Sequence, residues 1–421
     1  MRGRRYIYEL IAVAGALLFF CSCQRHDIYV SPDGDDSADG TIENPYRTIA
    51  KAITEIRPGE TIYLREGTYK PTAEEAMGGT LHGLYLCVYM LDASGSEFRP
   101  LTISGYEDEK VTIDLSGVVP ENQRVSGFQL SGDYWRLRKF DIVGIQVTQT
   151  GHTQSENITL TGSNCIIERV NMHDGMGIGL YAKSGRGNLV LNCDAYNNYD
   201  PVSENGKGGN CDGFGFHLSD PQCTGNVIRG CRAWRNSDDG FDLINNLAEV
   251  EIDSCWSWQN GYDSNMTARA DGSGFKMGGY GLRKMAVNPV PPMNVVKNSI
   301  AWENKNVGFY SNHHLGGIRF ENNRSGRNNY NYNFVNQIAH NDNTDVGGYG
   351  HVIKNNVSYR GARGEYTMID PSQCTVEGNT FLPDMALTDS SFVSVDPALL
   401  YSQRQKDGSL PDIDFLRLRQ E

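Results

Sequence analysis

Two similar segments of this 421-residue chain decide the fold, NSDDGFD at residues 236–242 and GSGFKMGG at residues 272–279. Each contains a Gly-Phe pair followed by a charged residue, which is Asp242 in the first segment and Lys276 in the second. The motif recurs on both sides, as GFH at 215–217, GFY at 308–310 and, more weakly, GLY at 179–181. Five copies of one short strand indicate stacked turns of a solenoid.

Side chains alternate between the two faces of a strand, so each copy predicts one inward and one outward residue. The predicted inward column is Leu180, Phe216, Phe241, Phe275 and Phe309. The predicted outward column is Tyr181, His217, Asp242, Lys276 and Tyr310. Neighbouring rungs of a sheet lie about 4.8 Å apart. Asp242 and Lys276 should therefore be neighbours on one outer wall, which we interpret as the active site.

The rest of the chain fits one elongated all-β domain over residues 27–421. Short-strand units recur at intervals of 23 or 24 residues, as from Cys165 to Asn188 and from Asn226 to Val250. Longer intervals indicate loops inserted into a basic coil, at 197–212, 262–272 and 278–293. A period in the twenties without a helix in each repeat predicts a single-stranded parallel β-helix.

The two ends of such a solenoid expose sheet edges that need cover. The segment from Thr48 to Ile56 has apolar residues on one helical face and predicts an N-terminal capping helix. Residues 405–421 are predicted to cap the other end.

Three further columns have structural interpretations. The aligned residues are Tyr196, Trp234, Trp258 and Trp302; Asn198, Asn236, Asn260 and Asn304; and Cys193, Cys231 and Cys255. Stacked Asn amides can hydrogen-bond along the solenoid axis, and stacked free thiols behave as small apolar groups.

The N-terminus predicts an exported protein. Three arginines precede an apolar run at residues 10–20 that is too short to span a bilayer, and Cys23 follows a small residue. We interpret residues 1–23 as a lipoprotein signal with Cys23 as the lipidated residue; a standard secretory signal is the alternative. We therefore expect an outer-membrane lipoprotein, facing the periplasm or the cell surface, that meets the membrane only through this anchor and is monomeric. The net charge of −13 argues against nucleic acid as the main partner.

Four carboxylates gather at one corner of the predicted coils. Asp238, Asp239 and Asp242 come from one turn and its strand, and Asp212 precedes the strand of the coil before. Such a group is strongly self-repelling unless a cation lies within it. Ligands that are all oxygen suit Ca²⁺ better than Zn²⁺ or Mg²⁺, so we predict a calcium site.

Lys276 beside a bound cation is a plausible proton acceptor. Together with calcium it predicts β-elimination on a uronic-acid polymer, in which the lysine removes the C5 proton and the C4 glycosidic oxygen leaves. The leaving-group acid stays open among His217, Tyr310, His313 and water. The predicted substrate contacts are His217, Arg269, Arg283, Lys284, Lys305, Tyr310 and His313.

The motifs NCDGFG (210–215), NSDDGFD (236–242) and GSGFKMGG (272–279) resemble those of polysaccharide lyase family 9. This resemblance implies a right-handed parallel β-helix and a pectate lyase or rhamnogalacturonan I lyase that acts on acidic plant cell-wall pectin. It also implies calcium ligation by Asp212, Asp238, Asp239 and Asp242, with Lys276 as the base.

Three alternatives remain at this point. A β-helix glycoside hydrolase needs a carboxylate pair, which Asp238 and Asp239 offer superficially, but it leaves Lys276 unexplained. A non-catalytic glycan-binding surface solenoid would keep the aromatic and Asn columns without needing this lysine. A C5-epimerase shares the proton abstraction and is the third alternative.

Overall fold

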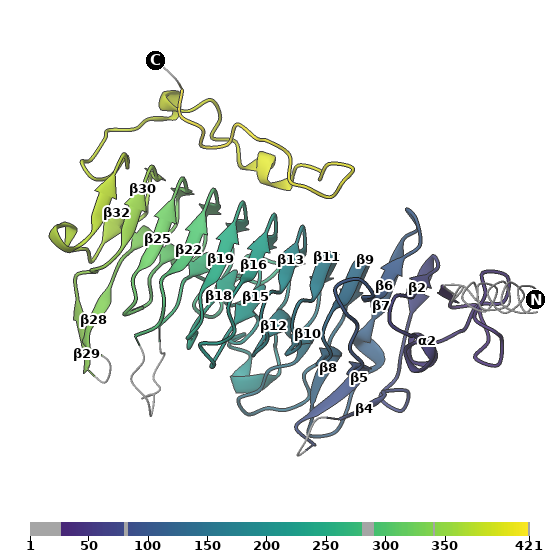
Figure 1. Ribbon diagram of the computed structural model, residues 1–421. Helices are drawn as coiled ribbons and strands as arrows, with labels where there is room; N and C mark the ends of the chain where they lie inside the picture. The colour runs from purple at the N-terminus through teal and green to yellow at the C-terminus, as the bar shows by residue number, and fades with distance from the viewer. Residues whose placement is uncertain (1–26, 80–82, 280–289, 340–341, 420–421) are drawn as a thin grey trace, which may run out of the picture.

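The computed structural model describes residues 27–79, 83–279, 290–339 and 342–419. Its strands stack along one axis, from β2 at the N-terminal end to β32 at the opposite end (Figure 1). Successive coils pair in parallel, as β15 with β18 and β18 with β21. The predicted all-β parallel β-helix is confirmed.

One sheet carries the Gly-Phe strands, and its pairings are parallel except for that between β4 and β5. Its strands are β4 (Gly78–Gly79), β5 (Tyr85–Leu91), β8 (Arg124–Leu130), β10 (Glu156–Leu160), β12 (Ile178–Ala182), β15 (Phe214–Phe216), β18 (Phe241–Asp242), β21 (Phe275–Lys276), β24 (Val307–Tyr310), β27 (Tyr330–Asn333) and β32 (Gly364–Thr367).

A larger sheet forms the other faces of the coil. It bends at β11, because this strand pairs with β13 through its first half and with β14 through its second half. Its strands are β1 (Ile28–Val30), β2 (Thr61–Leu64), β3 (Gly67–Tyr69), β6 (Leu101–Gly105), β7 (Val111–Asp114), β9 (Trp135–Val143), β11 (Ile166–His173), β13 (Leu189–Leu191), β14 (Asp194–Tyr196), β16 (Asn226–Arg229), β17 (Arg232–Trp234), β19 (Val250–Asp253), β20 (Trp256–Trp258), β22 (Asn294–Lys297), β23 (Ile300–Trp302), β25 (Ile318–Glu321), β26 (Arg324–Gly326), β30 (Val352–Lys354), β31 (Val357–Tyr359) and β33 (Thr375–Glu377).

The predicted N-terminal helix is confirmed as α2 (Ile49–Glu55). Thr48 is its N-cap and accepts a hydrogen bond from the Lys51 backbone N–H at 3.2 Å. Ile49 and Ala52 are buried in the main core, so the helix covers the first coils through its apolar face. The remaining two strands, β28 (Asn336–Ala339) and β29 (Asp342–Val346), form an antiparallel hairpin.

Inside the coil, aromatic rings stack from rung to rung. The rings of Phe241 and Phe275, and those of Phe275 and Phe309, have centroids 4.8 Å apart, and all three side chains are fully buried. Both predicted columns are wrong at one rung, because Phe214 rather than Phe216 pairs with Phe241, and Gly215 rather than His217 pairs with Asp242. The segment GFGF at residues 213–216 contains two consecutive Gly-Phe pairs, and the first of them is in register with the other copies.

The predicted Asn ladder is confirmed and continues to Asn328. Asn236 donates to Asn260, and Asn260 to Asn304, through side-chain amides at 3.1 and 3.0 Å. The residue before each ladder Asn takes a left-handed conformation, with φ of 54° at Gln259 and 50° at Glu303. The left-handed conformation costs a residue with a side chain about 1–2 kcal/mol. The hydrogen bonds of the buried Asn amides stabilise the turn in which this residue lies.

The aromatic and cysteine columns are also confirmed. Trp234 stacks on Tyr196 and on Trp258, with ring centroids 4.2 and 4.7 Å apart. Cys193, Cys231 and Cys255 are free thiols buried inside the coil, so this column packs as small apolar groups.

Replacing a central ladder residue should lower stability strongly. The Asn260 amide donates to two further acceptors, the Ala233 carbonyl at 3.1 Å and the Ser257 hydroxyl at 3.0 Å. Each buried partner left unsatisfied costs about 1–3 kcal/mol. We therefore expect Asn260→Ala to lower the free energy of unfolding by about 3 kcal/mol in urea titrations.

The exposed Asn44 provides the control, because Asn44→Ala should change the free energy of unfolding by less than about 0.5 kcal/mol. Equal effects of the two substitutions would contradict the ladder's role.

The predicted C-terminal cap is wrong. The C-terminal segment instead lies along one side of the strand stack (Figure 1). The Tyr401 ring packs edge-on against Trp258 at 5.2 Å, and the Phe415 ring against Trp302 at 4.9 Å. The outer aromatic ladder thus serves as the docking surface of the tail.

Residues 1–26, which include the predicted signal and Cys23, lie outside the described residues. Within the described part of the chain, no helix has the length and apolar character that a membrane span requires.

Candidate active site

A cavity of about 560 Å³ opens on the outer wall of the Gly-Phe sheet. Its lining comes from β8, β12, β18, β21 and the loops between them. The lining residues are Arg124, His152, Gln154, Tyr181, Lys183, Asn210, Asp212, His217, Ser219, Asp238, Asp242, Ile244, Asn245 and Lys276. Four of the five predicted catalytic and metal-binding residues therefore share one cavity, and the fifth, Asp239, is fully buried and contacts Lys276.

Lys276 lies one rung from Asp242, as the repeat predicts. Its Nζ is 3.0 Å from Asp239 Oδ2 and 3.5 Å from Asp242 Oδ2. The exposed fraction of the Lys276 side chain is 12%. The amine thus lies between two buried carboxylates while still reaching the cavity.

Asp212, Asp238 and Asp239 form a compact acidic cluster. Each offers a carboxylate oxygen, and these atoms all lie within 4.8 Å of one another. Asp212 and Asp239 hold equivalent positions in successive coils, since the Gly after each precedes a paired Phe. Asp212 also accepts the Asp239 backbone N–H at 3.0 Å.

Two of the predicted insertion loops converge on Asp238. Its carboxylate accepts the backbone N–H of Asn210 at 2.8 Å and that of Asp271 at 3.1 Å. The loops therefore fix the orientation of this side chain at the cavity rim.

Burial and mutual repulsion perturb these groups. Burial raises the pKa of Asp212 well above its usual range, and the negative charge of Asp238 adds to this increase. Burial also raises the pKa of Asp239 to about 8, although Lys276 opposes this shift. Burial lowers the pKa of Lys276, but Asp239, Asp242 and their neighbours more than offset it and hold this pKa well above its usual value. The carboxylates of the metal-free site therefore outnumber the single ammonium group of Lys276 that is available to neutralise them.

Asp242 behaves differently from the other three carboxylates. Burial opposes its ionisation, but Lys276 and then His217 outweigh that effect and lower its pKa to about 2. His217 Nε2 is 3.6 Å from Asp242, and the other ring nitrogen of His217 lies 2.9 Å from the Tyr181 hydroxyl. Lys276 and His217 thus both favour the ionised form of Asp242, which faces them at 3.5 and 3.6 Å.

Four of the described substrate contacts predicted from sequence do not line this cavity: Arg269, Lys305, Tyr310 and His313. Arg269 forms a bidentate ion pair with Asp263, at 3.0 and 2.7 Å, and lies over the Tyr199 ring. Lys305 donates to the backbone carbonyls of Arg269 and Ala270. Both cations are engaged in holding the 262–272 loop. Arg283 and Lys284 lie outside the described residues.

The other two of these predicted contacts, Tyr310 and His313, belong to the coil that follows Lys276. Tyr310 pairs with Lys276, and burial raises its pKa to about 12. His313 is 2.9 Å from the exposed Asp345 of the β28–β29 hairpin. Neither residue is among those that line the cavity.

Sequence reasoning missed the N-terminal half of the cavity, which Arg124, Gln154 and Lys183 line together with His152. Arg124 begins a strand that contains a further Gly-Phe pair, Gly127-Phe128, and Phe128 is in register with Ile158 and Leu180. This pair and the position of Tyr181 in the outward column were the sequence signals that pointed to this region.

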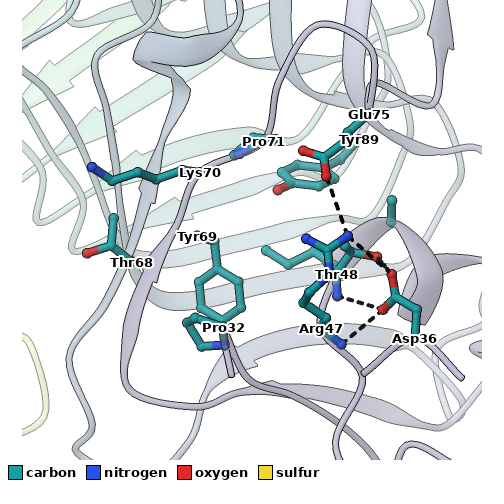
Figure 2. Close-up of a pocket in the computed structure, with 12 residues that line it drawn as sticks. Pro32, Asp36, Arg47, Thr48, Thr68, Tyr69, Lys70, Pro71, Glu75 and Tyr89 are labelled. Atoms are coloured by element: carbon teal, nitrogen blue, oxygen red, sulfur yellow. Dashed lines mark hydrogen bonds and ion pairs between the residues drawn. The ribbon is translucent and has the colours of Figure 1, made fainter. Parts of the chain in front are cut away.

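A second cavity, of about 290 Å³, lies beside α2 at the N-terminal end (Figure 2). Arg47 pairs with Glu75 at 3.5 Å and with Asp36 at 3.9 Å, and Lys70 pairs with Asp114 outside the lining. The Tyr69 hydroxyl donates to the Val30 carbonyl. Among the residues that line it, we find no acid–base or metal-binding set comparable to that around Lys276.

Comparison with known proteins agrees with this geometry. The family described as "Pel9A-like, right handed beta helix region" matches residues 28–372. The chain belongs to this family. The predicted membership of polysaccharide lyase family 9 and the right-handed coil are thereby confirmed.

Several named proteins are similar to this chain over most of its length. The chain is 32% identical over 396 residues to pectate lyase L of Dickeya chrysanthemi, covering 93% of this chain and 83% of that protein. A solved structure named rhamnogalacturonan lyase is 41% identical, with a TM-score of 0.89 and coverage of 93% and 96%. The crystal structure of pectate lyase Pel9A is 29% identical, with a TM-score of 0.72 and coverage of 94% and 90%.

Proposed function

We propose that this protein is a calcium-dependent polysaccharide lyase that cleaves a galacturonate-containing pectic polymer by β-elimination. The observation that carries this proposal is the position of Lys276, which joins a three-carboxylate cluster to an open cavity. The relatives named pectate lyase and rhamnogalacturonan lyase support the same chemistry. A hydrolase would need a carboxylate pair free to act on the bond, whereas Asp239 is fully buried against Lys276.

The acidic cluster fits calcium. Ca²⁺ takes oxygen ligands at about 2.3–2.6 Å, so two of its ligands can be at most about 5 Å apart. The oxygens of Asp212, Asp238 and Asp239 meet this condition. Asp242 is proposed as a fourth ligand. Calcium bound there would supply positive charge for the substrate carboxylate and for the enolate-like charge that develops in the reaction.

The chain's own residues would carry the proton transfer. Lys276 Nζ, as the neutral amine, takes the C5 proton of a uronate, and the electron pair of that C–H bond forms the C4–C5 double bond. The bond from C4 to the glycosidic oxygen breaks, and this oxygen leaves with its electron pair and is protonated. A cation among the carboxylates offsets the negative field that raises the pKa of Lys276, which favours the neutral amine.

Two pectic backbones are candidate substrates, homogalacturonan and rhamnogalacturonan I. The greater similarity to the rhamnogalacturonan lyase structure makes rhamnogalacturonan I the first to test. We expect ultraviolet absorbance from the conjugated double bond when the protein acts on one of these polymers with calcium, and none after chelation. Reducing ends without absorbance would indicate hydrolysis. Epimerised sugars without cleavage would indicate an epimerase, and binding without turnover a non-catalytic solenoid.

Calcium affinity should depend on pH. The metal must displace protons from Asp239, whose metal-free pKa is about 8, and from Asp212. Affinity should therefore rise as pH increases from about 5 to 8. Raised carboxyl pKa values also mean that the metal-free fold binds more protons than the unfolded chain, so its stability should fall over the same range. Calorimetric titration of calcium at several pH values checks the predicted rise in affinity. A calcium affinity that does not change with pH would contradict this prediction.

We also propose that the protein is exported as a lipoprotein through residues 1–23. Cys23→Ala should abolish incorporation of labelled palmitate and release the protein from the membrane fraction. Unchanged labelling would exclude Cys23 as the acceptor.

A further inference from the structure

The cavity contains a second charged group, several rungs toward the N-terminus from Lys276. It consists of Arg124 on β8 and Lys183 just after β12, with Tyr85 on β5 and Glu156 on β10 beside them. From Lys276 the pairing steps run through Asp242 and Gly215 to Tyr181, two residues before Lys183. At about 4.8 Å a step, this rung lies about 14 Å along the wall.

Buried polar contacts hold Lys183 in place. Its Nζ is 3.2 Å from Glu156, a carboxylate with no exposed surface, and 3.1 Å from the Tyr85 hydroxyl. The Tyr85 hydroxyl in turn donates to Glu156 at 2.5 Å. The ammonium also lies over the rings of Tyr85 and Tyr181, at 4.5 and 5.0 Å from their centroids. A lysine held this way is pre-organised, so less side-chain entropy is lost when it binds a ligand.

Arg124 supplies a second cation with unused donor capacity. One of its terminal nitrogens donates to the Tyr85 hydroxyl at 3.3 Å. Within the described ranges, its buried Nε has no hydrogen-bond acceptor. A guanidinium presents paired donors that match a carboxylate. Arg124 and Lys183 carry two positive charges, and Glu156 beside them carries one negative charge. This end of an otherwise acidic cavity therefore has a net positive charge.

We propose that Arg124 and Lys183 form a carboxylate-binding subsite for a uronate of the bound polymer. This inference rests on the proposed function. Lys183 follows a strand three rungs from that of Lys276, and Arg124 lies on a strand five rungs away. The subsite therefore binds a different sugar from the one that loses its C5 proton. The polymer then runs along the solenoid axis, and the subsite selects chains with a second, unesterified uronate on the N-terminal side.

Calorimetry with an inactive Lys276→Ala background tests the subsite on defined probes. The probes are oligogalacturonates and rhamnogalacturonan I oligosaccharides, each with free or methyl-esterified carboxyl groups. Adding Lys183→Met or Arg124→Gln should weaken binding of the free acids about 10- to 100-fold, as expected for hydrogen bonds to charged groups. Binding of the esters should change less than about threefold. Lys183→Arg should retain most of the affinity.

Matched controls separate this proposal from a folding defect. Lys354 is as exposed as Lys183, 35% against 34%, and is likewise paired with a glutamate, but on β30. Lys354→Met should leave binding unchanged. If Lys183→Met unfolds because Glu156 loses its partner, Lys183→Met/Glu156→Gln removes both charges and should show the same loss of affinity.

The outcomes are distinct from those for the proposed function. If the wild type yields unsaturated products but the Lys183 and Arg124 variants bind free acids as tightly as the background does, the subsite is wrong and the lyase assignment stands. If the wild type yields no unsaturated product from either polymer, the proposed function itself fails. Equal losses for acids and esters would also overturn the subsite.

Discussion

We expect Lys276→Ala to lower kcat on the preferred pectic polymer by about a thousandfold, because general base catalysis typically contributes about 10²–10⁴-fold. Lys276 is in contact with Asp239 and Asp242 and reaches the cavity. The rate of ultraviolet absorbance increase at saturating substrate and calcium measures the loss.

A structural role would give a different result. Removing the ammonium also removes a positive charge beside the acidic cluster, so calcium should bind Lys276→Ala at least as tightly as the wild type. Added primary amines should restore part of the rate. The control Lys354→Ala should retain full activity. A Lys276→Ala variant that keeps more than about a tenth of kcat, or that loses calcium binding along with activity, would contradict the assignment of Lys276 as the base.

Asp238→Asn should weaken calcium binding by at least about a hundredfold. Loss of groups that merely support a metal ligand typically costs about 10- to 100-fold, and Asp238 is proposed as a direct ligand. It is also the least buried of the three carboxylates, and asparagine keeps one of the two oxygens that accept backbone N–H groups there. Calcium calorimetry measures the affinity directly.

Asp271→Asn is the matched control for this substitution. The Asp271 side chain is 72% exposed and lies 3.9 Å from Lys276, outside the three-carboxylate cluster. Its loss should change calcium affinity by less than about threefold. Equal effects of Asp238→Asn and Asp271→Asn would indicate diffuse electrostatic attraction rather than ligation.

The repeat pattern predicted the part of the site that depends on register. Asp242 and Lys276 follow equivalent Gly-Phe pairs, and parallel pairing then makes them neighbours without further information. The ladders around Trp258 and Asn260 were predictable for the same reason, since a constant spacing of two residues separates the two columns in each coil. The error at Phe216 arose where one strand contains the motif twice.

Other features carried no periodic signal. The tail is held by single long-range contacts, such as those that Arg404 makes with Asp194 and with the Gly230 carbonyl at 2.9 Å. Residue type alone also could not distinguish cations that face the cavity from cations engaged elsewhere. Lys183 and Lys305 are both lysines near the site, yet only the first lines the cavity, while backbone carbonyls bind the second.

The most direct test of the central claim is a crystal structure of Lys276→Ala with calcium and a pectic oligosaccharide. We expect an ion within about 2.3–2.6 Å of oxygens from Asp212, Asp238 and Asp239. The same ion should contact the carboxylate of a uronate whose C5–H points at residue 276. An ion bound elsewhere, or a sugar whose C5–H faces away from that residue, would contradict that claim.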